Sequence, residues 1–342
     1  MRADSPPPVA PVPACPVCGE TRRSVLHAGL ADLAFGVAGG RWTIQRCDRC
    51  GAAYLDPRPA DEALEGLYAH YYTHEPPVPN LAPPGPAARF ARGLRNAHLA
   101  RALGYELQPS LRVGGVLGRL IPGFAALAER PVRGLPAGAK VLDVGAGNGL
   151  FVAEARAWGL KAAGIELDKG AAAAGRRAGL DLEVETAAER AAREPGTYDA
   201  VTLSHVIEHV PDPVGLLRDC ARLLRPGGSL WIATPNLDAA GHRRFGPAWL
   251  HLDPPRHLVL FDAPSLVAAT EAAGLHDARV VHPVPNASKV YAASATIARG
   301  EVAGPAPPPA PRSVRAAALA ADLRAQSRRR LAEELVVAAR SG

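Results

Sequence analysis

Four of the five cysteines fall in two pairs whose spacing suits a metal ion, Cys15-Pro-Val-Cys18-Gly and Cys47-Asp-Arg-Cys50-Gly. Two thiolates three residues apart on a tight turn can bind one ion, and the following glycine relieves strain in the turn. Two disulfides, a redox pair or a chance spacing are the alternatives. We expect no secretory signal in the proline-rich first residues, which argues against disulfides, and a redox motif would not usually occur twice. The pattern therefore predicts a structural Zn²⁺ held by four thiolates, with no open coordination position.

A glycine-rich turn follows an apolar run in the second half of the chain, in Asp143-Val144-Gly145-Ala146-Gly147-Asn148-Gly149. Glycine at every second position lets the backbone approach a ligand closely and turn sharply into a helix. A dinucleotide-binding turn reads G-x-G-x-x-G, whereas this one reads G-x-G-x-G. Glu166 closes the next strand, where its carboxylate could accept both hydroxyls of a ribose, and Asp143 could hold an ammonium group. The predicted ligand has an amino-acid end and a ribose, with no obligatory phosphate.

Histidines lie at the expected end of the fourth strand, in His205-Val206-Ile207-Glu208-His209. The segment also matches the H-x-x-E-H pattern of one metalloprotease group. It lies at a strand end and Pro211-Asp212-Pro213 follows it, so we reject the peptidase interpretation. His205 and His209 should instead line the mouth of the sheet, where either is a candidate catalytic base. A hydrogen-bonded wall that orders the loop is the alternative.

A third candidate base, His257, lies in the irregular segment 238–264, which is rich in His, Pro and Trp. A loop that holds Trp249, His251, Asp253 and His257 is costly to order unless it packs on something. We expect it to contact the acceptor, and a purely structural cap is the alternative.

The sequence around these motifs predicts the elements that must position them. Strands are expected over 140–144, 161–165, 182–184, 199–204, 229–234 and 278–284, with short strands near 25–27 and 42–46. Helices are expected over 61–72, 150–158, 169–178, 214–224 and 264–273. Strands that alternate with helices at this spacing predict an α/β fold with a doubly wound, mostly parallel sheet. Cys220 stands alone in a helical pattern and should fill the core.

Proline-rich stretches divide the chain into expected domains. These are a disordered leader (1–13), a zinc-ribbon module (14–56), a helical linker region (57–134), a ligand-binding α/β domain (135–300), a proline-rich linker (301–312) and a C-terminal helix (313–342). The C-terminal helix is expected to be amphipathic, with Val314, Leu319, Leu323, Leu331, Leu335 and Val336 as its apolar members.

Composition excludes several classes of protein. The chain has 342 residues, of which 48% are hydrophobic, and no apolar run approaches the roughly 20 residues of a membrane span. The formal net charge is +6, but only 5% of residues are aromatic and the arginines are scattered, so no nucleic-acid partner is expected. Arg328-Arg329-Arg330 is the exception, and we interpret it as a solvated face; contact with acidic lipid or a partner is the alternative. A cytoplasmic location is expected, and the oligomeric state is not predicted.

Four segments in combination, VLDVGAGNG, AAGIELD, YDAVTLSHVIEHVPDP and LLRPGGSLWIATPN, resemble the class I S-adenosylmethionine-dependent methyltransferases over about residues 137–300. The resemblance implies a seven-stranded, Rossmann-like sheet with S-adenosyl-L-methionine as cofactor, and adenine packing by residues 186–189. It implies cofactor contacts from Asp143, Gly145, Gly147, Asn148, Gly149, Glu166, Leu167, Ala188, Ser204 and His205. Ubiquinone-pathway O-methyltransferases are particularly similar across the fourth strand. They carry an acidic residue in place of His205, which argues against their metal-assisted mechanism here.

The whole chain is similar to a narrower bacterial group in which a zinc ribbon precedes this domain. Phe35-Gly36-Val37, Tyr71-Tyr72-Thr73-His74 and residues 245–261 match that group's patterns. Its members look like tailoring enzymes for saccharides or secondary metabolites. We therefore expect a methyltransferase for a hydroxyl of a small molecule or saccharide. An NAD-linked oxidoreductase on a Rossmann-like fold and a non-catalytic zinc-ribbon binding protein are the alternatives.

Overall fold

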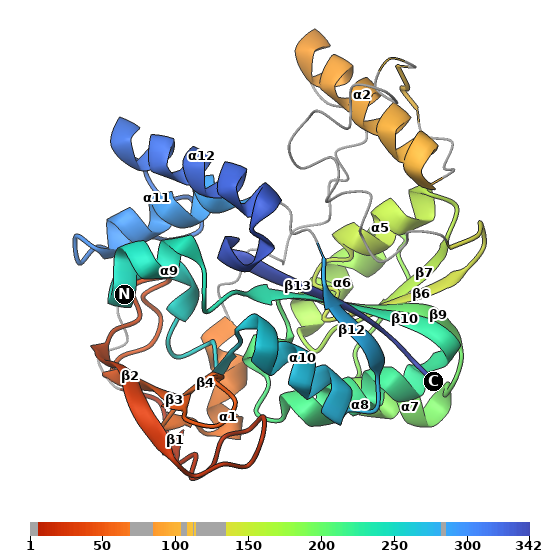
Figure 1. Ribbon diagram of the computed structural model, residues 1–342. Coiled ribbons are helices and arrows are strands. Elements are labelled where there is room, and N and C mark those ends of the chain that lie inside the picture. Colours follow the sequence, from red (N-terminus) through yellow and green to blue (C-terminus); the bar gives the residue numbers. More distant parts are fainter. Residues whose placement is uncertain (1–5, 69–84, 104–107, 112, 114–134, 282–284) are drawn as a thin grey trace.

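The computed structural model describes residues 6–68, 85–103, 108–111, 113, 135–281 and 285–342 (Figure 1). Its centre is a seven-stranded sheet in the order β12-β13-β10-β9-β6-β7-β8. Five neighbouring strands run parallel: β6 (Lys140–Val144), β7 (Lys161–Ile165), β8 (Leu182–Glu183), β9 (Tyr198–Ser204) and β10 (Leu224–Pro235). This confirms the predicted fold class and five of the predicted strands.

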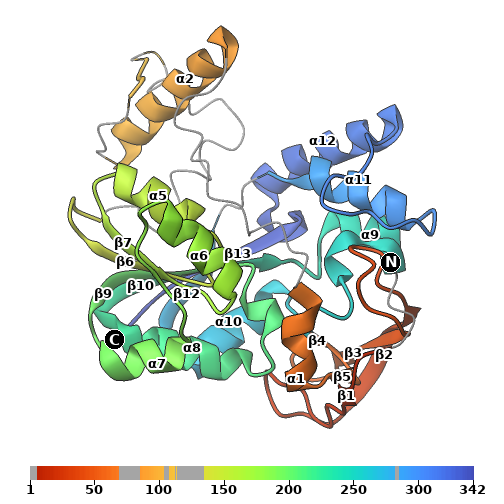
Figure 2. The same cartoon turned by 180° about the vertical axis from the view of Figure 1, so that it is seen from behind.

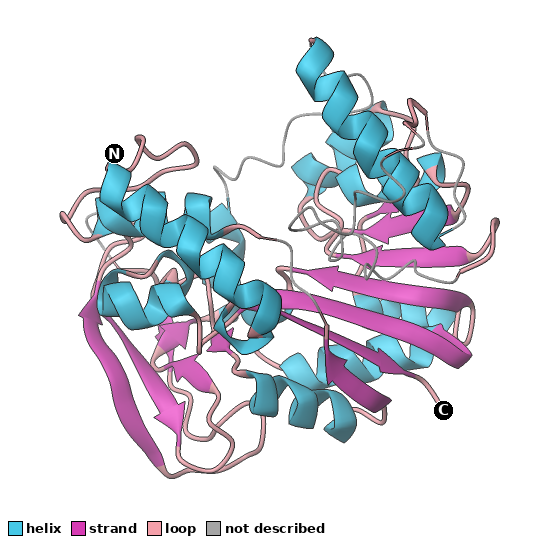
Figure 3. Cartoon of the chain, turned by 45° about the horizontal axis from the view of Figure 1, so that its top comes forward, coloured by secondary structure: helices cyan, strands magenta, loops and turns pink. Residues whose placement is uncertain are grey.

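The other two strands lie at the β10 side of the sheet. β13 (Glu334–Arg340) runs antiparallel to both of its neighbours, β10 and β12 (His276–Val280). Figure 3 shows the central strands side by side in one layer. The predicted strand 278–284 overlaps β12, and residues 282–284 lie outside the described part of the chain.

Helices cover both faces of this sheet (Figures 1 and 2). One face carries α5 (Leu150–Ala157) and α6 (Lys169–Arg177), and the other carries α7 (Ala187–Arg193), α8 (Pro213–Leu223) and α10 (Ala263–Ala272). Four of these five helices match the prediction to within a residue or two. The sequence analysis missed α7, which begins at a capping box formed by Thr186 and Glu189. Cys220 is fully buried on α8, as expected of a core residue.

The C-terminal region corrects the prediction of one helix over 313–342. It consists of α12 (Arg312–Ser327), the short 3-10 helix η7 (Arg329–Leu331) and the strand β13. Seven residues of β13 pair with β10, and Leu335, Val336 and Val337 are buried. Burial on both faces of a sheet favours such a continuous apolar, β-branched run over an amphipathic helix. The sheet therefore extends to residue 340, beyond the expected domain end at residue 300.

Two helices beside this region pack on each other. α11 (Ala287–Ile297), which the sequence analysis missed, packs against α12 through Tyr291 and Ala318. The segment between β10 and α10 contains α9 (Ala240–Phe245), the 3-10 helices η5 (Gly246–Ala248) and η6 (Leu250–Leu252), and the strand β11 (Val259–Leu260).

The N-terminal module contains the predicted short strands as β2 (Arg23–Leu30) and β3 (Trp42–Cys47), followed by β4 (Ala53–Leu55). Its sheet has the order β11-β4-β3-β2, so β11 joins it from the segment that follows the fifth parallel strand. The module thus shares a sheet with the larger domain.

The expected disordered leader is wrong for residues 6–13. β1 (Val9–Ala10) pairs with β5 (Arg58–Pro59), and the Val12 N–H donates to Asp56 at 2.8 Å. Residues 1–5 lie outside the description.

The expected linker region begins with α1 (Asp61–Leu64) and the 3-10 helix η1 (Glu65–Tyr68), followed by α2 (Pro86–Leu103). The rest of the predicted helix 61–72, the Tyr71–His74 motif and residues 114–134 fall on residues that are not described. Among the described residues, no helix is long and apolar enough to cross a membrane.

Candidate active site

The order of the parallel strands reverses between β6 and β9, and open α/β sheets bind ligands at this point, beyond the carboxyl ends of the strands. The glycine-rich turn follows β6 and His205 follows β9, so the fold brings the two motifs together. Gly145 has a φ of 71°, and a Cβ there would lie 2.3 Å from the Val206 side chain. Only glycine allows this close approach.

Glu166 is locked to the turn by backbone donors. The Gly147 N–H donates to its Oε2 at 2.7 Å, and the Asp168 N–H donates to its Oε1 at 2.8 Å. Each carboxylate oxygen can accept a second hydrogen bond, so two hydroxyls could still bind. The neighbouring Leu167 is 63% exposed, which leaves an apolar surface beside the carboxylate. These groups fit a ribose and the flat face of an adenine.

The other residues predicted to contact the cofactor also lie near this edge. Asp143 is buried and accepts a hydrogen bond from the Thr202 hydroxyl, which joins β6 to β9. Asn148 and Gly149 complete the turn, and Gly149 precedes α5 with a φ of 83°. Ser204 is exposed at the end of β9, and Ala188 is exposed on α7. The contact of each with a cofactor stays a prediction.

His205 lies between two carboxylates. Its Nδ1 is 3.1 Å from Glu208 Oε1, and its Nε2 is 3.2 Å from Glu334 Oε1. Burial disfavours the charged ring, but these two carboxylates outweigh it and raise the pKa of His205 well above its ordinary value. The backbone of His205 has a φ of 56°, a conformation that few non-glycine residues adopt. We infer that His205 is an imidazolium near neutral pH.

Glu208 is fully buried and anchors this arrangement. The Thr234 hydroxyl, on β10, donates to Glu208 Oε2 at 2.9 Å. Burial alone would raise the pKa of Glu208, but the hydrogen bond and charge of His205 lower it to about 2. The carboxylate is therefore ionised throughout the physiological range.

His209 and His257 are held in the neutral form. Burial is the main cause, and it lowers the pKa of each to about 4. His209 Nδ1 lies 3.1 Å from the carbonyl oxygen of Arg256, and His257 Nδ1 lies 2.7 Å from that of His251. A carbonyl only accepts, so each Nδ1 carries the proton and each Nε2 keeps a lone pair.

The two neutral rings meet edge to face, with centroids 4.8 Å apart. Ligand atoms of Glu208, His209 and His257 all lie within 4.8 Å of one another. A carboxylate beside two neutral imidazoles could serve proton transfer, and the same donor set could hold a divalent cation.

The loop that carries His257 is fixed by Arg256, which is buried and pairs with Asp32 at 2.7 Å and with Asp253 at 2.5 Å. Its guanidinium also lies over the Phe35 ring, 4.6 Å from the centroid. Arg256 therefore has a structural role in this loop, for which a purely structural cap was the alternative interpretation.

Sequence reasoning gave no role to Thr234 or Glu334, and it named His251 only as part of the loop that was expected to contact the acceptor. Thr234 and Glu334 contact Glu208 and His205, as described above. His251 Nε2 is buried without a hydrogen-bond partner in the described part of the chain, and the ring centroids of His205 and His251 lie 6.1 Å apart. Glu334 precedes the apolar run 335–339, and interpreting that run as a strand would have placed it at the mouth of the sheet.

The four predicted metal ligands come together in the N-terminal module. The Sγ atoms of Cys15 and Cys50 are 3.6 Å apart, and those of Cys18 and Cys47 are 3.5 Å apart. A tetrahedron of thiolates around Zn²⁺ requires about 3.8 Å between sulfurs, whereas a disulfide requires about 2 Å. The next residues, Gly19 and Gly51, have φ values of 73° and 80°. The four cysteines could hold one structural zinc ion.

Comparison with known proteins agrees with the arrangement of motifs at the edge of the seven-stranded sheet. Residues 116–280 match the family model described as "Methyltransferase domain". Over these residues the chain is similar to a methyltransferase domain. The match agrees with the cofactor expected from the sequence, S-adenosylmethionine.

Curated relatives match a shorter segment. The ubiquinone biosynthesis O-methyltransferase of Xanthomonas oryzae pv. oryzae (strain PXO99A) is 42% identical over 106 residues, which are 29% of this chain and 44% of that protein. The enzyme of the same name from Xanthomonas axonopodis pv. citri (strain 306) is 40% identical over 107 residues, 30% of this chain and 45% of that protein. The chain thus spans less than half the length of these relatives.

Solved structures are similar at a looser level. A SAM-dependent methyltransferase from Archaeoglobus fulgidus aligns over 67% of this chain and 93% of its own, with a TM-score of 0.43 and 17% identity. A possible histamine N-methyltransferase from Thermotoga maritima aligns over 72% of this chain and 100% of its own, with a TM-score of 0.42 and 17% identity.

Proposed function

We propose that the protein transfers a methyl group from S-adenosylmethionine to a hydroxyl of a small molecule, such as a saccharide or a secondary metabolite. The observation that carries the proposal is the pair of motifs at the switch point of the sheet. A ribose-binding carboxylate, Glu166, is locked to the glycine turn on one side, and a cluster of histidines and carboxylates lies on the other. The O-methyltransferase relatives support a hydroxyl acceptor.

When bound, S-adenosylmethionine supplies an electrophilic sulfonium methyl, which a hydroxyl oxygen can attack in line with the breaking C–S bond. The protein's part is to align the two reactants, exclude water and accept the hydroxyl proton. Glu166 and the glycine turn would hold the ribose and the amino-acid end.

We assign proton removal to the neutral pair His209 and His257. Each has a lone pair at Nε2, because its Nδ1–H donates to a backbone carbonyl. The proton of the acceptor would pass to one of these nitrogens as the new O–CH₃ bond forms. His205 is already protonated between Glu208 and Glu334, so it would orient the acceptor as a hydrogen-bond donor.

Calorimetric titration with S-adenosylmethionine and with NAD tests the cofactor. We expect micromolar-scale binding of S-adenosylmethionine, which Glu166→Ala weakens by about 2 kcal/mol, the range for a lost hydrogen bond to a charged group. Glu271→Ala is the matched control, because that carboxylate is exposed on α10, on the opposite face of the sheet from α5 and α6. Heat with NAD and none with S-adenosylmethionine would favour the oxidoreductase alternative, and heat with neither would favour a binding protein.

A further inference from the structure

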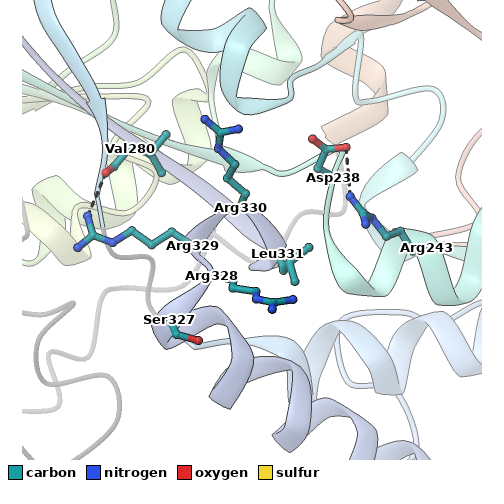
Figure 4. Close-up of a pocket in the computed structure, with 8 residues that line it drawn as sticks. All are labelled: Asp238, Arg243, Val280, Ser327, Arg328, Arg329, Arg330 and Leu331. Atoms are coloured by element: carbon teal, nitrogen blue, oxygen red, sulfur yellow. Dashed lines mark hydrogen bonds and ion pairs between the residues drawn. The ribbon is translucent and has the colours of Figure 1, made fainter.

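A cavity of about 650 Å³ lies beside the candidate active site, and arginines dominate its wall (Figure 4). It is lined by Asp238, Arg243, Val280, Ser327, Arg328, Arg329, Arg330 and Leu331. Four of these eight residues are arginines and one is acidic. Three of the arginines form the run that the sequence analysis interpreted as a solvated face.

The acidic partner in this cavity is already engaged. Asp238 forms an ion pair with Arg243 at 3.8 Å, and Arg329 donates to the Val280 carbonyl at 3.1 Å. Figure 4 shows no hydrogen bond or ion pair between Arg328 or Arg330 and Asp238, the acidic residue of this wall. Several guanidinium groups with one carboxylate among them leave a positive potential that a bound anion would neutralise.

The turn that carries these arginines is held in place. Asn236, which is 1% exposed, donates from Nδ2 to the carbonyls of Arg330 at 3.0 Å and Ala332 at 2.7 Å. Its own N–H donates to the Glu333 carbonyl at 3.1 Å. These hydrogen bonds hold the segment that carries the three arginines next to the end of β10, so their positive charges stay close together.

The cavity opens at the same edge of the sheet as the histidine cluster. β10 and β12 end there, and β13 begins there at Glu334, four residues after Arg330. Along this edge the glycine turn and Glu166 follow β6 and β7, His205 follows β9, and the arginines border β10, β13 and β12. Two strand spacings separate β9 from β13, which is about 10 Å.

We propose that this cavity binds a phosphoryl group carried by the methyl acceptor, a proposal that rests on the proposed methyltransferase function. The acceptor would place its hydroxyl at the histidine cluster and its phosphoryl group among the arginines, at the same edge of the sheet. The planar guanidinium fork suits phosphoryl oxygens, which it can bind in pairs. Several arginines in one cavity favour a group with more than one negative charge over a single carboxylate.

Calorimetry at low salt tests the site with three probes: inorganic pyrophosphate, glucose 1-phosphate and glucose. We expect the two phosphorylated probes to bind and glucose not to bind. Arg328→Gln/Arg330→Gln should weaken the phosphorylated probes by at least about 10-fold. The matched control is Arg312→Gln/Arg315→Gln, which removes the same charge from exposed positions on α12. That variant should bind as the wild type does.

Several results would overturn the proposal. Equal weakening in the control variant would show a general charge effect. Binding of citrate in preference to pyrophosphate would assign a carboxylate ligand. Binding to phosphatidylglycerol vesicles that depends on Arg328 and Arg330, without pyrophosphate binding, would assign a membrane contact. Titration of the same protein with S-adenosylmethionine distinguishes failure of the phosphoryl site from failure of the proposed methyltransferase function. Cofactor binding without phosphate binding would contradict only the phosphoryl site.

Discussion

His209 and His257 are both neutral, and for the same two reasons. Each donates from Nδ1 to a carbonyl of the segment 250–258, and burial lowers the pKa of each to about 4. His205, a few residues away, has the opposite state because two carboxylates contact its ring. A charged histidine can orient a substrate by donating a hydrogen bond, while a neutral histidine beside it accepts the substrate's proton.

Alanine substitutions test this division on a confirmed acceptor. We expect His257→Ala to lower turnover by about 10²-fold or more, the usual scale for general acid–base groups, while the affinity for S-adenosylmethionine changes little. His205→Ala should lower turnover to a similar degree through lost orientation. His276→Ala is the control, since that histidine is exposed on β12.

Two outcomes would contradict the assignment. Wild-type turnover in both active-site variants would mean that alignment alone drives the reaction. A second equivalent of bound metal per chain that disappears in His257→Ala would assign the cluster to a metal ion.

The pH dependence of stability gives a second test of the neutral His257. The pKa of His257 is about 4 in the folded chain and near 6.5 in the unfolded chain. The stability that the neutral ring contributes to the folded chain is therefore fully present above pH 6.5 and is lost as the pH falls toward 4. Between pH 7 and pH 5 the wild type should lose roughly 2 kcal/mol relative to His257→Gln. Urea unfolding of both proteins at each pH measures the difference. Parallel pH profiles would show that His257 titrates normally.

At the scale of elements, the N-terminal module and the loop 253–262 form one unit. β11 pairs with β4, Arg256 pairs with the buried Asp32, and Arg46 lies 3.4 Å from Asp262. Zinc bound by the four cysteines would therefore stabilise the loop that carries His257, although it would lie outside the histidine cluster.

Loss of zinc should loosen this wall. We expect one zinc ion per chain in the wild type and a large loss of zinc in Cys15→Ser/Cys47→Ser, because thiolates supply all four ligands. Amide hydrogen exchange should then rise in β2, β3 and β4 and in residues 253–262, while β6 and β7 stay protected. Elemental analysis and exchange mass spectrometry measure the two effects.

Full zinc content in the variant would contradict the site. Faster exchange confined to the cysteine turns would contradict the coupling to the loop. Cys220→Ser is the control for the loss of a thiol, because Cys220 lies on α8 and not in the cysteine cluster.

At the scale of the whole molecule, the sequence predicted those features that depend on residues close together in the chain. Apolar runs bounded by glycine or proline turns marked the parallel strands, and spacing marked the four cysteines. It did not predict contacts made by segments far apart in the chain, such as Asp32 with Arg256 or Glu334 with His205. Each of those contacts depends on strands that enter a sheet from a distant part of the chain, β11 and β13, and local periodicity carries little information about such pairing.

Leucines 323 and 335 offer a matched test of the corrected C-terminal fold. Both were expected on the apolar face of one helix, but Leu323 is 51% exposed on α12 and Leu335 is fully buried on β13. Leu335→Ala should lower the free energy of unfolding by about 2–5 kcal/mol, because it leaves a cavity in the buried core. Leu323→Ala should change it by less than about 0.5 kcal/mol, as exposed substitutions usually do. Chemical unfolding of the two variants measures both values, and equal losses would restore the single-helix interpretation and remove Glu334 from the active site.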